Sequence, residues 1–248
     1  MINIVIPVYN EGGNVQKLFD NILSSITIPF DIIMVYDFDE DNTLPVVHKI
    51  KNNYPFTIRL EKNIYGRGAL NAIKTGFTKA TAETVLVIMA DLSDNLGAVD
   101  GMYQKILEGY DIVCGSRYMK GGKQIGGPWL KKLFSRLAGV SLHYLIRIPT
   151  HDISNSFKMY RTEVLRNIKI ESNGGFVIGM EHTVKAYIMG YRLAAVPSTW
   201  YDRTDGVSRF RMWKWIPKYL KWYRLGIISS WFKKKGTIVH ENNHSIPS

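Results

Sequence analysis

The sequence predicts an α/β fold in which a mostly parallel central sheet is flanked by helices. The first 120 residues alternate short apolar runs with segments of helical spacing, the pattern of a parallel sheet covered on both faces. The apolar runs are continuous, as expected for strands buried on both sides. With 248 residues and 46% hydrophobic content, the chain can bury one substantial core.

The elements follow in order along the chain. Expected strands occupy residues 2–8, 30–35, 56–60, 85–89 and 112–115. Expected helices occupy residues 14–26, 42–53, 68–79 and 96–108, where apolar residues recur every three or four positions. The pattern then loosens into a glycine-rich basic loop at 120–128, an amphipathic helix at 129–145, a strand at 154–160, a helix at 180–189 and a strand at 191–196.

The positive charge of the chain is concentrated near its C-terminus. The net charge is +11, and residues 209–235 hold nine Lys or Arg but no Asp or Glu. The remaining 23 basic residues nearly match the 21 acidic ones, so the body of the chain is close to neutral. A uniformly basic protein would indicate nucleic acid more readily, and we expect no nucleic-acid partner.

The basic C-terminal segment also has helical spacing and four of the six tryptophans. Its apolar positions are Met212, Ile216, Tyr219, Leu220, Tyr223, Ile227 and Trp231. Basic residues interleaved with aromatic ones are typical of a helix that lies in a membrane surface. We therefore expect a catalytic domain at 1–210, an amphipathic helix at 211–236 that docks on an anionic membrane, and a disordered tail at 237–248. Packing of this helix against the domain, or self-association as a homodimer, would fit the same pattern.

Two features bear on the compartment of the protein. Cys114 is the single cysteine and lies in an apolar run, where a small buried hydrophobe is expected. The N-terminal residues lead directly into a strand without a basic segment, which argues against a signal peptide. We expect a protein that is peripheral on the cytoplasmic face of a membrane.

Acidic side chains gather where three expected strands end. They include Glu11, Asp37, Asp39, Asp41, Asp91 and Asp94. Ligands of open α/β sheets bind beyond the carboxyl ends of the strands, and carboxylates placed there suit a divalent cation that serves a phosphate. Asp91 and Asp94 are the candidate metal ligands, with Arg67 and Arg117 as nearby cations. The alternatives are a helix cap for Asp94 and solvated loop acids for Asp39 and Asp41.

Several short motifs occur in an order that resembles a known family. They are Pro7-Val8-Tyr9-Asn10-Glu11, the loop 37–43, Tyr65-Gly66-Arg67-Gly68-Ala69, Ala90-Asp91-Leu92, Gly115-Ser116-Arg117-Tyr118, Ser135 with its basic neighbours, Asp152-Ile153-Ser154-Asn155-Ser156-Phe157-Lys158, and Val196-Pro197 followed by Arg203-Thr204-Asp205-Gly206-Val207-Ser208. Together they resemble the family 2 glycosyltransferases of the GT-A fold, and within them the dolichol-phosphate mannosyltransferase group without membrane-spanning helices. The resemblance covers residues 3–210.

The resemblance implies an enzyme that transfers one sugar from a nucleotide-sugar donor to a polyprenyl phosphate with Mg²⁺ or Mn²⁺. It places Pro7, Tyr9, Glu11, Asp37, Asp39, Gly66, Arg67, Gly68, Ala90 and Asp91 at the donor. It places Arg117, Lys131, Ser135, Arg203 and Ser208 at the acceptor phosphate, with Asp91, Arg117 and Arg203 as the catalytic residues. An ionised phosphate is already a nucleophile, so such a reaction needs no general base.

The chain departs from the family pattern at three positions, which are Tyr36, Met89 and Ser93. Met89 and Tyr36 stand where the family has aspartates, so the donor base and sugar stay open between GDP- and UDP-hexose types. One rival is transfer to a glycan hydroxyl, with Asp152 or Glu181 as the base. Other rivals are a non-catalytic nucleotide-sugar binding module and a nucleotidyltransferase, whose basic glycine-rich loop after the first strand is missing here.

Overall fold

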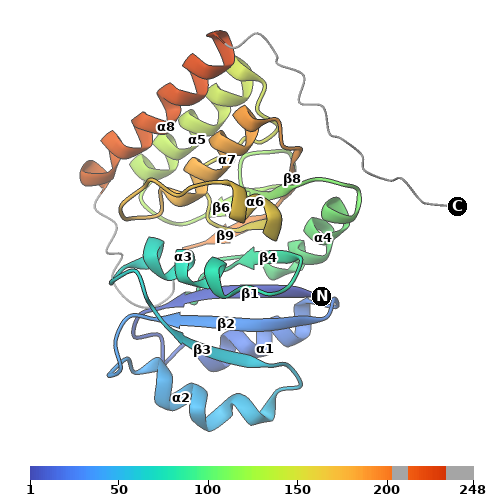
Figure 1. Ribbon diagram of the computed structural model, residues 1–248, viewed down its shortest axis with the longest axis vertical. Coiled ribbons are helices and arrows are strands. Elements are labelled where there is room, and N and C mark those ends of the chain that lie inside the picture. Colours follow the sequence, from blue (N-terminus) through green and yellow to red (C-terminus); the bar gives the residue numbers. More distant parts are fainter. Residues whose placement is uncertain (203–211, 233–248) are drawn as a thin grey trace, which may run out of the picture.

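The computed structural model describes residues 1–202 and 212–232, and it has a seven-stranded sheet at its centre (Figure 1). The strands are β1 (Ile2–Val8), β2 (Phe30–Tyr36), β3 (Ile58–Lys62), β4 (Thr84–Val87), β5 (Ile112–Ser116), β7 (Lys158–Arg161) and β8 (Leu193–Pro197). Their order is β3-β2-β1-β4-β7-β5-β8. β7 is antiparallel to both of its neighbours, and the other pairs are parallel. The expected mostly parallel sheet is confirmed.

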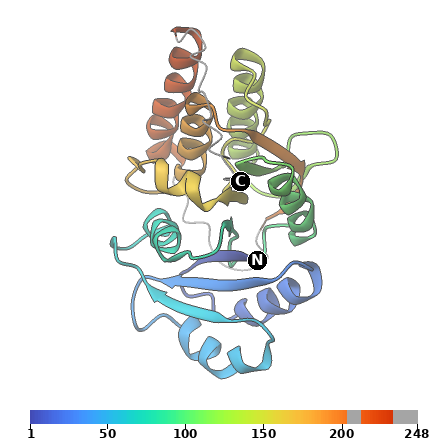
Figure 2. The same ribbon diagram turned by 45° about the vertical axis from the view of Figure 1, so that its right-hand side comes forward.

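Helices cover both faces of the sheet (Figures 1 and 2). They are α1 (Val15–Ser25), α2 (Thr43–Ile50), α3 (Ala69–Lys79), α4 (Val99–Leu107), α5 (Trp129–Ile146), α6 (Thr162–Asn167), α7 (Ile178–Met189) and α8 (Met212–Phe232), with short 3₁₀ turns at Lys51–Asn53 and Leu96–Ala98. Alternate residues of β1 point to opposite faces, so Ile4 joins one core with α1, α2 and α4, and Val5 joins the other with α3, α7 and α8.

Four elements differ from the expectation. The loop at 120–128 contains β6 (Lys123–Ile125), which pairs in parallel with β9 (Thr199–Tyr201). The strand expected at 154–160 begins only at Lys158, because the chain bends before it and Asn155 Nδ2 donates to the Gly115 carbonyl of β5 at 3.0 Å. Helix α6 was not expected, since six residues carry too little periodicity to recognise.

The last helix, α8, packs on the rest of the protein along part of its length. Trp222 is 1% exposed, and its Nε1 donates to Ser172 Oγ at 3.0 Å. Tyr219, Tyr223 and Ile227 also pack against the core. This half of the aromatic pattern therefore faces the protein, whereas Leu220 and Trp231 are exposed. The expected domain boundary at 210 and the expected tail at 237–248 lie outside the described residues.

Across residues 1–202 and 212–232, the structure contains no helix with the length and apolar character needed to cross a bilayer.

Candidate active site

The carboxyl ends of β1, β2 and β4 lie side by side, because β1 pairs in parallel with both of the others. Asp41 fixes the first two of the loops that follow these strands. It is 1% exposed and accepts hydrogen bonds from the Asn10 amide, at 3.1 Å to each oxygen, and from the Thr43 amide at 2.9 Å. Asp41 is therefore a structural acid rather than a solvated one.

Two aromatic rings and a guanidinium group, from Tyr9, Phe38 and Arg67, contact one another at these loops. The Tyr9 ring is 40% exposed and contacts Phe38 edge to face, with 5.4 Å between ring centroids. The Arg67 guanidinium carbon lies 5.3 Å from the centroid of the Phe38 ring. Flat rings with a nearby cation suit a nucleotide base and its phosphates. The sequence patterns singled out Tyr9 and Arg67 but missed Phe38, whose only signal is its place between two acids of the loop.

Asp37 has both carboxylate oxygens engaged by the turn after β3. Its Oδ1 accepts from Asn63 Nδ2 at 2.8 Å, and its Oδ2 accepts from the Gly68 amide at 2.9 Å. Gly66 and Gly68 have φ of +85° and +120°, which a residue with a Cβ adopts only at a cost. Asp37 thus holds the glycine turn in position at the start of α3. Asp39 lies apart from it on the surface, paired with Lys62.

Asp91 and Asp94 bracket a tight turn beyond β4. Asp91 Oδ1 accepts from the Ser93 amide at 3.2 Å, and the intervening Leu92 has φ +61°, an unusual backbone for leucine. Asp94 Oδ2 accepts from the Met89 amide at 3.0 Å. Burial raises the pKa of Asp94 to about 7, with a further rise from the charge of Asp91. A nearby cation would stabilise the ionised form of Asp94 and so lower this pKa.

The carboxylates at this strand end suit a metal ion whose other ligands are phosphate oxygens and waters. Among the described residues no three His, Cys, Asp or Glu side chains group closely enough to cage a metal ion. Mg²⁺ and Mn²⁺ that serve nucleotides are bound by one or two carboxylates, with phosphate oxygens and waters as the other ligands. Asp91 and Asp94 at the strand end fit this pattern, and Ala90 between β4 and Asp91 is buried.

Beyond the carboxyl end of β5, Arg117 forms a buried ion pair with Asp152. Arg117 is 8% exposed and Asp152 is fully buried. Arg117 Nε and Nη2 donate to the two oxygens of Asp152 at 2.6 and 2.9 Å, and the Arg117 amide donates at 3.1 Å. Burial alone would raise the pKa of Asp152, but the Arg117 charge and hydrogen bonds outweigh it and lower that pKa below its ordinary value.

Hydroxyl groups surround the same guanidinium. Arg117 Nη2 donates to Ser135 Oγ at 3.0 Å and to Ser154 Oγ at 3.3 Å, and these two hydroxyls are 2.7 Å apart. The Tyr118 hydroxyl lies 3.0 Å from Ser135 Oγ. The structure thus brings Arg117 and Ser135 together, and their contact with an acceptor phosphate stays a prediction.

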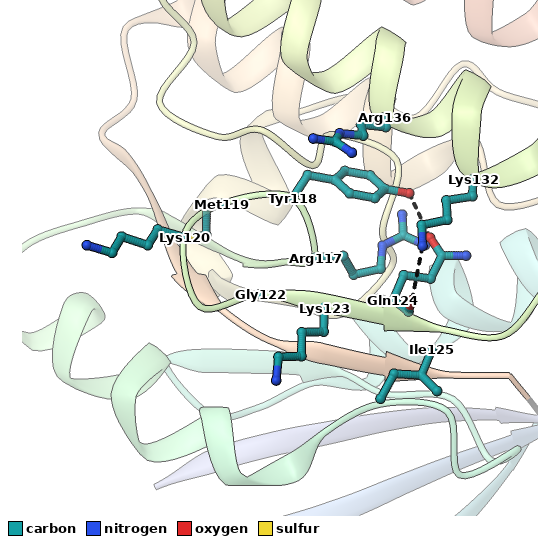
Figure 3. Close-up of a pocket in the computed structure, with 10 residues that line it drawn as sticks. All are labelled: Arg117, Tyr118, Met119, Lys120, Gly122, Lys123, Gln124, Ile125, Lys132 and Arg136. Atoms are coloured by element: carbon teal, nitrogen blue, oxygen red, sulfur yellow. Dashed lines mark hydrogen bonds between the residues drawn. The ribbon is translucent and has the colours of Figure 1, made fainter.

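These groups open onto a cationic pocket of about 510 Å³. Figure 3 shows the side chains that line it, among which are Arg117, Lys120, Lys123, Lys132 and Arg136, and no acid. Lys132 Nζ donates to the Gln124 carbonyl at 3.2 Å, so β6 and α5 are linked across the pocket. Such a concentration of positive charge attracts a phosphate. The sequence showed Lys132 and Arg136 only as basic residues near the start of a helix.

Glu181, the other acid considered as a general base, also accepts several hydrogen bonds. Glu181 is fully buried and accepts from Lys185 Nζ at 2.8 Å and from the amides of Glu171 and Ser172 at 2.6 and 2.9 Å. Burial raises the pKa of Glu181, but the hydrogen bonds from Lys185 and Ser172 lower it by more, so the pKa lies below its ordinary value. Glu181 therefore anchors the 171–172 segment to α7.

The structure also places several of the remaining predicted site residues. Pro7 is buried in β1, and the Glu11 amide donates to Thr43 Oγ1 at 2.9 Å. Lys131 Nζ lies 5.9 Å from the centroid of the Trp200 ring. Arg203 and Ser208 lie outside the described residues, so their predicted contacts with the acceptor stay predictions.

Comparison with known proteins gives a family match. Residues 3–169 match the model of Glycosyl transferase family 2. A dolichol-phosphate mannosyltransferase of Pyrococcus furiosus is 30% identical over 90% of this chain and 63% of its own length. A polyprenol monophosphomannose synthase of Mycolicibacterium smegmatis is 26% identical over 83% of this chain and 79% of its own. The chain therefore spans less than two thirds of the Pyrococcus relative.

Solved structures support the fold. A glucosyl-3-phosphoglycerate synthase of Mycobacterium tuberculosis, crystallised with Mn²⁺ and uridine diphosphate, superposes with a TM-score of 0.65. The match covers 95% of this chain and 82% of that one at 13% identity. TarS of S. aureus in complex with UDP gives a TM-score of 0.62, with 94% and 67% covered at 18% identity. The expected GT-A fold is confirmed, and by the family match over residues 3–169 the chain belongs to Glycosyl transferase family 2.

Proposed function

We propose that this chain is an inverting, metal-dependent glycosyltransferase that moves one hexose from a GDP- or UDP-type nucleotide sugar to a polyprenyl phosphate. The observation that carries the proposal is the cationic pocket lined by Arg117, Lys120, Lys123, Lys132 and Arg136, whose charge suits an anionic acceptor. The names of the Pyrococcus and Mycolicibacterium relatives support the same acceptor and a mannosyl donor.

The donor would bind at the ends of β1, β2 and β4. Tyr9, Phe38 and Arg67 supply a surface for the base, and the turn that Asp37 holds at Gly66 and Gly68 lets the backbone approach the donor. Asp91 and Asp94 would hold Mg²⁺ or Mn²⁺, which when bound offsets the charge on the leaving diphosphate. Pro7, Glu11 and Asp39 stay proposed contacts of the donor.

The acceptor phosphate would enter the pocket beside Arg117 and Ser135. An acceptor oxygen attacks the anomeric carbon as the bond from that carbon to the diphosphate oxygen breaks, and one displacement inverts the configuration. Phosphomonoesters have a second pKa near ~6, so the acceptor is largely ionised at neutral pH. Lys131, Arg203 and Ser208 are proposed further contacts of this phosphate.

Transfer to a sugar hydroxyl is disfavoured by the state of two acids. A hydroxyl acceptor needs a general base, and Asp152 and Glu181 both have lowered pKa values and full sets of hydrogen bonds. Asp94, with a pKa of about 7 when no metal is bound, would suit a base only where Asp91 alone holds the metal. That one observation keeps the hydroxyl acceptor as the second candidate.

One experiment separates the candidates. The protein is incubated with Mn²⁺ or Mg²⁺, a short polyprenyl phosphate or a soluble glycan, and each of several radiolabelled nucleotide hexoses. Acid-labile label that extracts into organic solvent supports the proposal, and label confined to the glycan supports the second candidate. Nucleotide binding without turnover on either acceptor would favour a binding module.

The reaction would take place at an anionic membrane surface, because its acceptor is a lipid. On this proposal the protein is peripheral on the cytoplasmic face, with the basic segment at 211–236 as part of its contact. A homodimer stays a further expectation that the described residues leave open.

A further inference from the structure

The outward side of α5 bears exposed apolar residues in two groups, at 129–137 and at 144–145, and Ser141 lies between them in contact with Tyr223 of α8. The exposed residues are Trp129 (70%), Leu130 (36%), Leu133 (42%), Phe134 (43%), Leu137 (55%), Tyr144 (74%) and Leu145 (45%). Single exposed apolar residues are ordinary, but a contiguous apolar surface marks an interaction site. We call these seven residues the α5 stripe.

The α5 stripe is a second apolar face, distinct from the one that packs inward. Its members up to Leu137 recur at the three- and four-residue spacing of one helix face, and Tyr144 follows seven residues later on the same face. The buried residues Gly139, Leu142 and Ile146 lie on the opposite face, and a Cβ on Gly139 would come within 2.1 Å of the His151 carbonyl oxygen. The inner face thus packs on the protein, α8 contacts α5 at Ser141 and Leu145, and the side chains of the stripe stay exposed for another partner.

Helix α8 extends the stripe at its C-terminal end. Trp231 is 64% exposed and its Nε1 donates to the Leu145 carbonyl at 3.4 Å, and Ile228 is 49% exposed. Figures 1 and 2 both show α5 and α8 at the end of the molecule opposite α2. The two helices therefore present their apolar residues at one end of the protein.

The charged residues of the segment that contains α5 are all of one sign. Residues 112–151 include seven Lys or Arg and no Asp or Glu. On α5 itself, Lys132 and Arg136 flank the stripe and line the cationic pocket. A second copy of the chain would bring these charges face to face, which is repulsive, whereas an anionic lipid surface would complement them.

We propose that the α5 stripe, extended by Ile228 and Trp231, seats the protein on an anionic lipid bilayer. Apolar side chains enter the boundary between headgroups and acyl chains, and Trp and Tyr at the ends of the stripe suit that interface. Lys132 and Arg136 then lie next to the lipid phosphates. The proposal rests on the proposed function for its biological purpose, and it moves the main docking surface from α8 to α5.

The test compares two charge-introducing double variants of the full chain. Leu137→Glu with Tyr144→Glu changes the stripe, and Leu23→Glu with Leu107→Glu changes exposed leucines of α1 and α4 that are 48% and 60% exposed. Binding is measured by co-sedimentation with vesicles of phosphatidylglycerol and phosphatidylcholine in equal parts. Each lost apolar contact and each added negative charge weakens binding, so the stripe variant should bind at least about tenfold more weakly. The control variant should bind like the parent.

Several results would overturn the inference. These are equal binding by the stripe variant, absence of binding by the parent chain, and a parent dimer in light scattering that the stripe variant abolishes. Circular dichroism melting of each variant confirms folding, and Tyr144→Glu alone serves if the double variant is unfolded. Because vesicle binding requires no turnover, a chain that binds through α5 but transfers no sugar would refute the proposed function while supporting this inference.

Discussion

Replacing Asp152 with asparagine removes one charge from the buried pair with Arg117 and keeps the shape of the side chain. Arg117 is 8% exposed and Asp152 is fully buried, so neither charge has water to replace its partner. Removing one member of such a pair typically costs about 3–5 kcal/mol, because the other charge stays buried and unmatched. With its carbonyl oxygen at the Oδ2 position, asparagine still accepts two of the three hydrogen bonds, so we expect a loss near the lower end, about 3 kcal/mol.

Urea denaturation at pH 7, followed by circular dichroism, measures this change. The matched control is Glu108→Gln, which breaks the exposed pair between Lys105 and Glu108 and should leave the unfolding midpoint unchanged. The pKa of Asp152 is lowered from its ordinary value of 3.8, so its contribution is present above pH 3.8 and is lost as the pH falls through the lower folded-state pKa. The difference between variant and parent should therefore shrink in acid.

Two outcomes would refute this reasoning. Equal stability of Asp152→Asn and the parent at pH 7 would mean that the pair contributes nothing, and a difference that grows in acid would mean that Asp152 is protonated in the fold. The variant should also lose transfer to polyprenyl phosphate, since Arg117 would no longer be held beside Ser135.

Three further predictions concern the donor site, the packing of α5 and a buried histidine. Asp91→Asn should lower kcat by about 10²–10³, the typical effect of removing one stabilising contact to the charge that develops on a leaving group, while nucleotide binding in titration calorimetry persists. Gly139→Ala should destabilise the protein in urea by about 1–3 kcal/mol because its Cβ would meet the His151 carbonyl oxygen at 2.1 Å, whereas Gly101→Ala, which faces open space on α4, should stabilise it by about 0.5–1 kcal/mol. Burial lowers the pKa of His182 from 6.5 to about 4, so between these pH values the unfolded chain binds a proton at this residue and the folded chain does not. The free energy of unfolding should therefore fall by about 3 kcal/mol as the pH drops from 6.5 to 4. His182→Leu should reduce this pH dependence, as measured by thermal melting at several pH values.

The sequence predicted the strands and helices of the N-terminal half because their signal is local. Continuous apolar runs and helical spacing report on one element at a time, and the resulting strands β1, β2, β4 and β5 are present. The sheet order is not local. β7 inserts between β4 and β5 in antiparallel orientation, and this brings Asp152 to Arg117 across 35 positions of sequence. No spacing rule could have paired them.

The faces of the two late helices show a second limit of sequence patterns. Aromatic and basic residues in α8 have the same spacing whether the aromatic side meets a membrane or the protein. In the structure Trp222 meets the protein, while the exposed apolar residues gather on α5, whose pattern predicted an amphipathic helix without saying that both of its faces are apolar. Periodicity locates a face, but only the tertiary contacts show what covers it.

The electrostatics of Arg117 connect these observations to the choice of acceptor. Its charge is already matched by Asp152, so the excess positive charge of the pocket comes from lysines of the β6 region and from Lys132 and Arg136 on α5. The same helix bears the apolar stripe. A phosphate presented at a bilayer surface would meet both the charges and the stripe, whereas the hydroxyl of a water-soluble sugar would gain from neither. The arrangement of α5 therefore argues for a lipid phosphate acceptor independently of the names of the relatives.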